Sequence, residues 1–155
     1  MYLKKIIPII ILPILFNILL SNELEKNKIL NIMVDHNYDL IDKKYSELDT
    51  FFCFPFLYND YEEIKSAMNE RELKKLLKKM RKKLPKNHSH KDWKKMNVKI
   101  LNESIALVNA MYSRVDKNNT NYFTGAAMYS FRKVDKKWKI FSITPFKPYD
   151  YFDFE

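Results

Sequence analysis

A chain of 155 residues fits one domain, and its 46% hydrophobic and 15% aromatic residues can bury a single core without cross-links. Its only cysteine, Cys53, excludes an internal disulfide and a thiolate metal cluster, and its only glycine, Gly125, argues against glycine-rich nucleotide-binding loops. The formal charge of +9 is compatible with a nucleic-acid or acidic-membrane partner. Lys, Ile and Asn are frequent throughout the chain, however, so the charge is weak evidence and we expect no nucleic-acid partner. We also expect no cofactor.

The amino terminus has the parts of an export signal. Lys4 and Lys5 precede the uncharged segment Ile6–Leu20. This segment is short for a bilayer-spanning helix, which needs about 20 apolar residues, so a signal peptide over residues 1–22 is favoured. The residues around Ser21 lack a small-x-small cleavage pattern, and an uncleaved membrane anchor formed by the same leader helix stays open. In both cases residues 23–155 are expected to be extracytoplasmic, either periplasmic or secreted.

The first half of the body predicts two helices followed by two strands. Apolar residues at helical spacing indicate a helix over Glu23–His36, and a second, short helix is expected over Leu40–Ser46. Thr50–Tyr58 has the aromatic composition of a strand, which Pro55 places at a sheet edge or a bulge. A short strand is expected around Glu63–Ala67.

The strongest helical pattern covers Glu70–Leu84. Leucines and a methionine recur there every three or four residues, and lysines fill the other faces. Asn69 is a good amino-terminal cap with Glu72 at the capping-box position, and Pro85 follows the end. The basic face could bind anionic lipid or nucleic acid, but a lysine-rich helix face is more often simply solvated.

The second half changes to a period of two, which predicts an antiparallel meander. We expect its strands to be joined by short hairpin turns and to be covered by helices on one face. Gly125, inside a strand, predicts a bulge or a sharp bend. The four expected strands are Lys95–Leu101, Ser104–Asp116, Tyr122–Val134 and Lys137–Thr144. The side chains expected on the covered face are Val108, Ala110, Tyr112, Arg114, Ala127, Tyr129, Phe131, Trp138, Ile140 and Ser142.

This order of elements resembles the SnoaL-like domains of the nuclear-transport-factor-2-like superfamily. The resemblance covers nearly all of residues 23–148 and depends on the layout together with several local echoes. These are Asn37-Tyr38-Asp39-Leu40 with Tyr45, Phe54-Pro55-Phe56, Ala106-Leu107-Val108 and the segment Asp135–Ile140. The resemblance implies an α+β fold in which a curved antiparallel sheet and about three helices form a cone around a cavity.

Relatives use such a cavity for binding or for catalysis, and fold alone does not decide between them. We expect a small, partly apolar or aromatic ligand, bound without metal or nucleotide. Aromatic side chains would contact it, and Arg114 would meet an anionic group at the rim. The same aromatic residues could equally be ordinary core. The expected ligand-binding residues are Phe54, Trp93, Tyr112, Arg114, Tyr129 and Trp138.

An isomerase, dehydratase or cyclase is the second hypothesis. His90 is the candidate general base because an imidazole changes charge near neutral pH, and Tyr112 or Tyr129 would donate to an oxyanion. His88, His90 and Asp92 have the residue types of metal ligands, but we interpret them as a polar loop, not a metal site. No carboxylate is expected on the inward strand faces, which argues against acid–base chemistry.

A third hypothesis makes the domain a non-catalytic interaction module. Met111, Met128 and Phe141 are expected on the outer face of the sheet, where they could anchor a homodimer.

Overall fold

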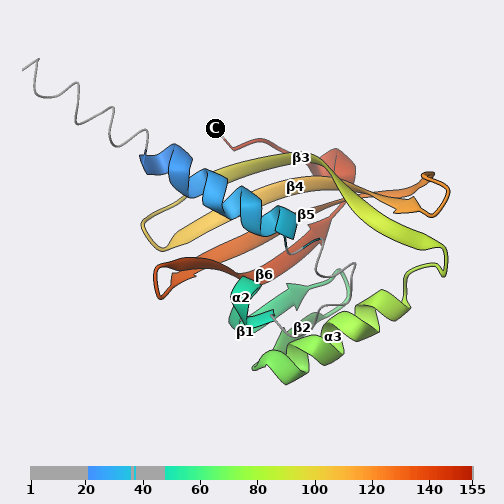
Figure 1. Cartoon of the computed structure of the whole chain (residues 1–155), viewed down its shortest axis with the longest axis horizontal. Helices are drawn as coiled ribbons and strands as arrows, with labels where there is room; N and C mark the ends of the chain where they lie inside the picture. Colours follow the sequence, from blue (N-terminus) through green and yellow to red (C-terminus); the bar gives the residue numbers. More distant parts are fainter. Residues whose placement is uncertain (1–20, 36, 38–47, 155) are drawn as a thin grey trace, which may run out of the picture.

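The computed structural model describes residues 21–35, 37 and 48–154. They form a mixed α+β domain in which helices lie against one face of a single curved sheet (Figure 1). The six strands occur in the order β2-β1-β6-β5-β4-β3. The predicted leader, His36 and the predicted helix Leu40–Ser46 lie outside the described residues, apart from the end of the leader at residues 21–22. Among the described residues, no helix is long and apolar enough to cross a bilayer.

The predicted meander is confirmed. Its strands are β3 (His88–Ile100), β4 (Ile105–Asp116), β5 (Asn121–Val134) and β6 (Lys137–Phe146), each antiparallel to the next. Strand β3 begins well before the predicted Lys95, so the interpretation of His88–Asp92 as a loop was wrong. Pairing explains the difference, because β4 extends to Asp116 and pairs with His88.

The first strand is also displaced from its predicted start. Leu48 and Phe51 are both buried at a spacing of three, so the chain forms the short helix α2 (Leu48–Phe51) before the strand begins. Strand β1 (Phe52–Asn59) pairs parallel with β6 and antiparallel with β2 (Ile64–Ala67). Its register on β6 shifts between Phe52 and Leu57, in agreement with the bulge that Pro55 predicted.

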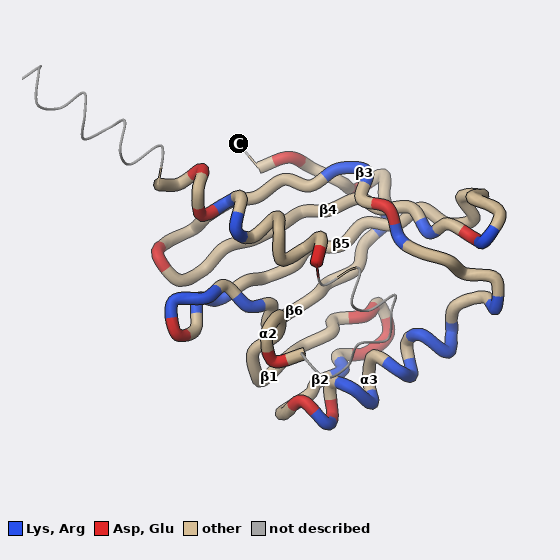
Figure 2. The backbone as a smooth tube through the Cα atoms, in the orientation of Figure 1, with Lys and Arg blue, Asp and Glu red and all other residues tan. Residues whose placement is uncertain are grey.

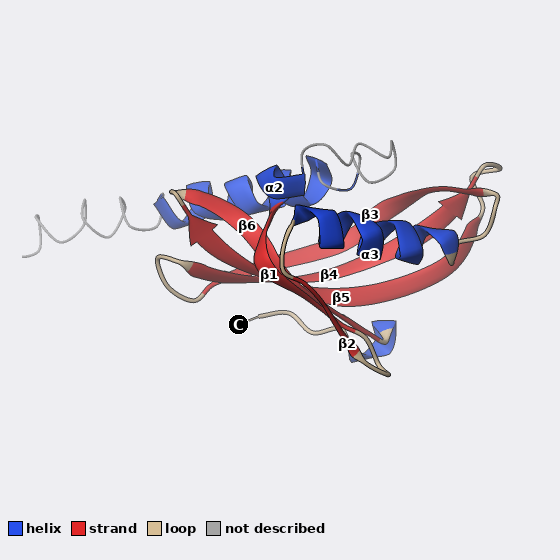
Figure 3. Ribbon diagram, turned by 90° about the horizontal axis from the view of Figure 1, so that it is seen from below, coloured by secondary structure: helices blue, strands red, loops and turns tan. Residues whose placement is uncertain are grey.

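Two longer helices cover the inner face of the sheet (Figure 3). Residues 21–35 are helical and bury Ile29 and Met33 completely. Helix α3 (Glu70–Lys82) buries Leu73 and Leu77, and Asn69 caps it by accepting a hydrogen bond from the Glu72 amide at 3.0 Å. The basic residues recur along the length of this helix (Figure 2).

Bulges change which side chains face inward along the strands. An extra residue in β6, between the partners of Ser130 and Phe131, turns Ile143 toward the core in place of the predicted Ser142. Of the bulge or sharp bend expected at Gly125, the bulge is absent at that residue, because Gly125 stays in register with Tyr112. A side chain at Gly125 would come within 2.8 Å of the Tyr112 hydroxyl, so the glycine makes room for that ring.

The carboxyl-terminal segment lies against part of the outer sheet face (Figure 3). Asn109 is completely buried on that face, and its amide donates to the Phe152 carbonyl. Lys95 forms an ion pair with Asp153 at 2.5 Å, and the rings of Phe146 and Phe152 stack. The carboxyl-terminal segment therefore covers part of the outer sheet face beside β4, the strand that carries Met111.

The amino-terminal helix is tied to the sheet through Glu25. Its carboxylate accepts hydrogen bonds from Trp138 Nε1 at 2.7 Å and from Lys133 Nζ at 2.6 Å. Trp138, predicted to bind ligand, is 3% exposed and packs at this junction. Hydrogen bonds from Lys133 and Lys28 lower the pKa of Glu25 from its usual 4.5 to about 2.

We predict that Glu25→Gln destabilises the domain at pH 7 by about 1 kcal/mol, because a partly exposed ion pair is screened by solvent. The folded-state pKa is lowered, so the contribution of this carboxylate is complete above pH 4.5 and is lost as the pH falls toward 2. Urea unfolding between pH 2 and 7 measures both effects. Glu23→Gln is the control, since Glu23 forms an ion pair with the neighbouring Lys26 on the same helix and, among the described residues, none with the sheet. A Glu25→Gln effect that persists unchanged at pH 2 would contradict the prediction.

Candidate functional site

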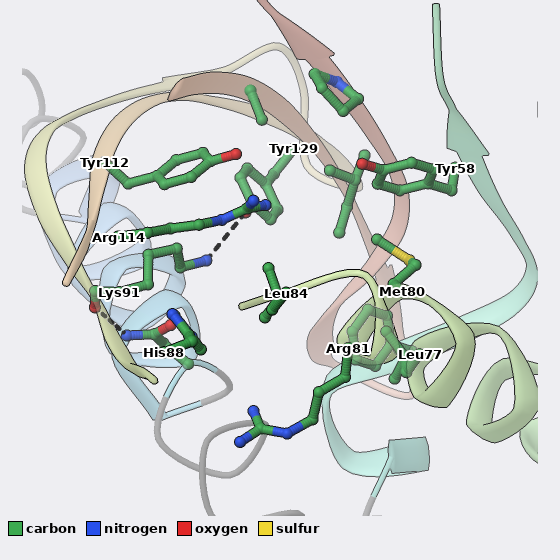
Figure 4. Close-up of a pocket in the computed structure, with 15 residues that line it drawn as sticks. Tyr58, Leu77, Met80, Arg81, Leu84, His88, Lys91, Tyr112, Arg114 and Tyr129 are labelled. Atoms are coloured by element: carbon green, nitrogen blue, oxygen red, sulfur yellow. Dashed lines mark hydrogen bonds between the residues drawn. The ribbon is translucent and has the colours of Figure 1, made fainter. Parts of the chain in front are cut away.

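A cavity of about 160 Å³ lies between helix α3 and the inner face of the sheet (Figure 4). It is smaller than the roughly 300–1,000 Å³ of sites for drug-sized ligands. A cavity of about 150 Å³ is, however, enough to hold one benzene ring. The described lining residues are Asn37, Phe52, Tyr58, Leu77, Met80, Arg81, Leu84, His88, Lys91, Tyr112, Arg114, Ala127, Tyr129, Ile143 and Pro145.

Three adjacent strands contribute polar groups at one end of the cavity. Lys91 of β3 is paired with Arg114 of β4, and Tyr112 stands two residues before Arg114 on the same face. Tyr129 comes from β5 and is 4% exposed. In Figure 4 the side chains of Lys91 and Arg114 run side by side and end near Tyr129.

Aromatic rings and one hydroxyl surround the Lys91 ammonium. Lys91 Nζ lies 3.9 Å from the centre of the Trp93 ring and 5.2 Å from that of Tyr112. It donates a long hydrogen bond of 3.4 Å to the Tyr129 hydroxyl. Desolvation, and after it the nearby charge of Arg114, lower the pKa of Lys91 from its usual 10.5 to about 7. The amine is therefore partly neutral near physiological pH.

The tyrosines of the cavity stay protonated. Burial is the main cause that raises the pKa of Tyr58 to about 12, and it raises the pKa values of Tyr112 and Tyr129 above their usual range. A neutral phenol can donate a hydrogen bond to a ligand oxygen.

The charged side chains among the described lining residues are all positive. Arg81, Lys91 and Arg114 line it, whereas none of the described lining residues is an aspartate or a glutamate. Arg114 lies over the Phe123 ring, with its guanidinium carbon 4.7 Å from the ring centre. A cation in a medium less polar than water attracts an anion more strongly than a solvated one does.

The two histidines of β3 occupy different positions. His88 lines the cavity, and its Nδ1 lies 2.7 Å from the Tyr122 hydroxyl. Desolvation, with the charge of Arg81 next, lowers its pKa. His90, the predicted base, is not among the lining residues, and its Nε2 pairs with Asp92 Oδ1 at 3.2 Å. In the described part of the chain, no three His, Cys, Asp or Glu side chains gather where they could hold a metal ion.

Three of the six predicted ligand-binding residues line the cavity, namely Tyr112, Arg114 and Tyr129. The other three pack around it or away from it. Trp93 stands behind Lys91, its Nε1 donating to the Met33 carbonyl at 3.3 Å, and Phe54 packs against the core.

Sequence reasoning missed Lys91, His88 and Tyr58. The strand β3 has irregularities between His88 and His90 and between Trp93 and Lys95. The second one hid Lys91, because Lys91 and Trp93 face inward before it and the even-numbered Met96 and Val98 after it. The usable signal was Trp93, a large apolar residue two positions from Lys91 in a polar stretch.

Solved structures with the same fold carry little sequence identity. A protein of unknown function with a cystatin-like fold from Nostoc punctiforme is 16% identical, with a TM-score of 0.66 over 79% of this chain and 90% of that one. An NTF2-like protein from Novosphingobium aromaticivorans is 11% identical, with a TM-score of 0.67 over 84% and 86%.

A protein provisionally assigned as a scytalone dehydratase, also from Novosphingobium aromaticivorans, is 19% identical, with a TM-score of 0.58 over 81% and 85%. At these identities the similarity shows the fold alone, and the cone-shaped α+β architecture expected from the sequence is confirmed.

Comparison with curated proteins of known function finds no match. The family described as "NTF2-like protein (DUF6841)" matches residues 36–148, which is most of the chain. The chain therefore belongs to this nuclear-transport-factor-2-like family.

Proposed function

We propose that the domain binds a small organic anion, one aromatic or apolar ring with a carboxylate, in the cavity of the cone. The observation that carries the proposal is the pairing of two cations, Lys91 and Arg114, in a cavity whose described lining includes no carboxylate. The tyrosines would add hydrogen-bond donors, and Leu77, Met80 and Ile143 would contact the ring. Neither a metal nor a nucleotide enters the proposal.

The size of the cavity limits the ligand to about one ring. Benzoate is therefore a suitable probe, and benzamide is its uncharged counterpart of nearly equal shape. If the two cations carry recognition, benzoate should bind at least tenfold more tightly than benzamide.

We predict that Arg114→Gln weakens benzoate binding by about tenfold to a hundredfold, because a hydrogen bond to a charged group is worth about 1.5–3 kcal/mol. Isothermal titration calorimetry of the full chain measures the change. Arg132→Gln is the matched control, since Arg132 is exposed on β5 and lies over Phe141 away from the cavity. Equal losses in both variants, or equal binding of benzoate and benzamide, would contradict the proposal.

We also predict that benzoate binding weakens as the pH rises from 6 to 8. The pKa of Lys91 is about 7 in the free protein, so an anion binds best to the protonated amine, and its affinity falls as the proton is lost. The other titratable or charged groups that line the cavity are Tyr58, Arg81, His88, Tyr112, Arg114 and Tyr129.

Titrations in buffers of different ionisation enthalpy report the proton taken up on binding. Lys91→Met should bind more weakly and lose most of the pH dependence, whereas His88→Asn should keep it. If the pH dependence is lost in His88→Asn and kept in Lys91→Met, the proton belongs to His88 and not to Lys91, and this account is refuted.

Catalysis of isomerisation, dehydration or cyclisation is the second candidate. It is favoured by Tyr112 and Tyr129, whose neutral hydroxyls face the same space as the two cations and could stabilise an oxyanion. His90 would need to move from its partner Asp92 to act as the base in this scheme.

We further propose that the chain is exported, with Ile6–Leu20 as a cleaved signal or a retained tether and the cavity on the extracytoplasmic side. The support is the sequence alone, a positive start followed by an uncharged segment. Cell fractionation with amino-terminal sequencing tests this. A start at Met1 in the membrane fraction supports the tether, a start near residue 23 supports cleavage, and a wholly cytoplasmic protein contradicts both.

A further inference from the structure

We propose that Lys91 acts as a nucleophilic amine that forms an imine with a small carbonyl compound carrying a carboxylate, such as a 2-oxo acid. This inference rests on the proposed anion site and gives it a reaction. In this arrangement Arg114 holds the carboxylate while the carbonyl carbon faces Lys91 Nζ.

The geometry supports the amine as the reacting group. Lys91 and Arg114 are direct partners across β3 and β4, so one cation can bind a carboxylate while its neighbour meets an adjacent carbonyl. Figure 4 shows both side chains ending in the cavity beside Tyr129. Because both groups of a 2-oxo acid lie on neighbouring carbons, this ligand class suits two neighbouring groups of the protein.

The surroundings of Lys91 distinguish it from the surface lysines. Its Nζ contacts the rings of Trp93 and Tyr112 and the Tyr129 hydroxyl, and no described carboxylate forms an ion pair with it. Lys95, on the same strand, instead pairs with Asp153 at 2.5 Å and has a half-exposed side chain. A lysine desolvated in this way next to another cation is the usual form of an amine nucleophile.

Burial adds to the reactivity, because it lowers the pKa of Lys91 to about 7 from the usual 10.5. At neutral pH the neutral, attacking form is then roughly a thousandfold more populated than in an ordinary lysine. Desolvation disfavours the charged form of the amine and is therefore the physical cause of its reactivity.

The reaction is a condensation and needs no oxidant or reductant. The Lys91 nitrogen lone pair forms a bond to the carbonyl carbon, and the π electrons of the carbonyl move to its oxygen. Protons pass from the nitrogen to that oxygen, which leaves as water when the carbon–oxygen bond breaks. The product is a carbon–nitrogen double bond between ligand and Lys91. The Tyr129 hydroxyl, 3.4 Å from Nζ, is placed to exchange hydrogen bonds with the amine during these transfers.

Reductive trapping of the full chain tests the inference. The protein is incubated at pH 7 with glyoxylate, a two-carbon aldehyde with a carboxylate, and sodium cyanoborohydride, and the modified lysines are mapped by peptide mass spectrometry. We expect the initial rate of modification to be at least tenfold higher at Lys91 than at Lys95. Excess benzoate should reduce modification at Lys91 and leave modification at Lys95 unchanged.

Two variants separate this inference from the proposed binding function. Lys91→Arg keeps the positive charge but has no primary amine, so trapping in the cavity should disappear, and a benzoate titration of the same variant reports separately whether the anion still binds. Lys95→Met is the matched control and should be trapped at Lys91 like the wild type. Mapping the modified lysines of the wild-type chain decides the question even if Lys91→Arg does not fold.

The possible failures have different meanings. Benzoate binding with no excess modification at Lys91 would overturn the imine and leave the anion site in place. Absence of both benzoate binding and preferential modification would overturn both proposals. Preferential modification at Lys91 that benzoate does not reduce would support the reactive amine but contradict the shared site.

Discussion

The arrangement of the cavity depends on holding a lysine ammonium among aromatic rings. Removing a cation from water is costly, and here the hydration shell of Lys91 is replaced by the rings of Trp93, Tyr112 and Tyr129. Trp93 is itself fixed by its hydrogen bond to the Met33 carbonyl, and Met33 is completely buried in the amino-terminal helix. The position of the amine is therefore set by helix, ring and strand together.

Strand bulges convert this local environment into a site. A strand with strict alternation could not direct both Lys91 and Met96 inward, because they are five positions apart, an odd number. The extra residue at Lys94 allows both, so the same strand contributes a polar group at one end of the cone and core packing at the other. In β6 an equivalent irregularity brings Ile143 to the cavity wall. Bulges commonly occur beside functional sites for this reason.

The architecture was predictable from the sequence, but half of the site was not. Periods of 3.6 and 2 are repeated over many residues, so the helix ending near Lys82 and the meander were both visible in the sequence. Tyr112 and Tyr129 followed from the same alternation. Lys91 did not, because one inserted residue reverses the alternation and leaves no compositional mark. Trp138 has the composition of a ligand contact, but its indole nitrogen has a partner 113 residues earlier in the chain, Glu25, which no local pattern can identify.

The net charge of the chain says little about its function, whereas the location of two of its basic residues says much. Most lysines of α3 are exposed to water, where the attraction of an anion at 4 Å is only about 1 kcal/mol. Around Lys91 the medium is less polar, and the same attraction is several times stronger. Desolvation therefore has two consequences at one position. It strengthens the attraction for an anionic ligand while the amine is charged, and it releases the proton that would otherwise prevent the nitrogen from reacting with that ligand.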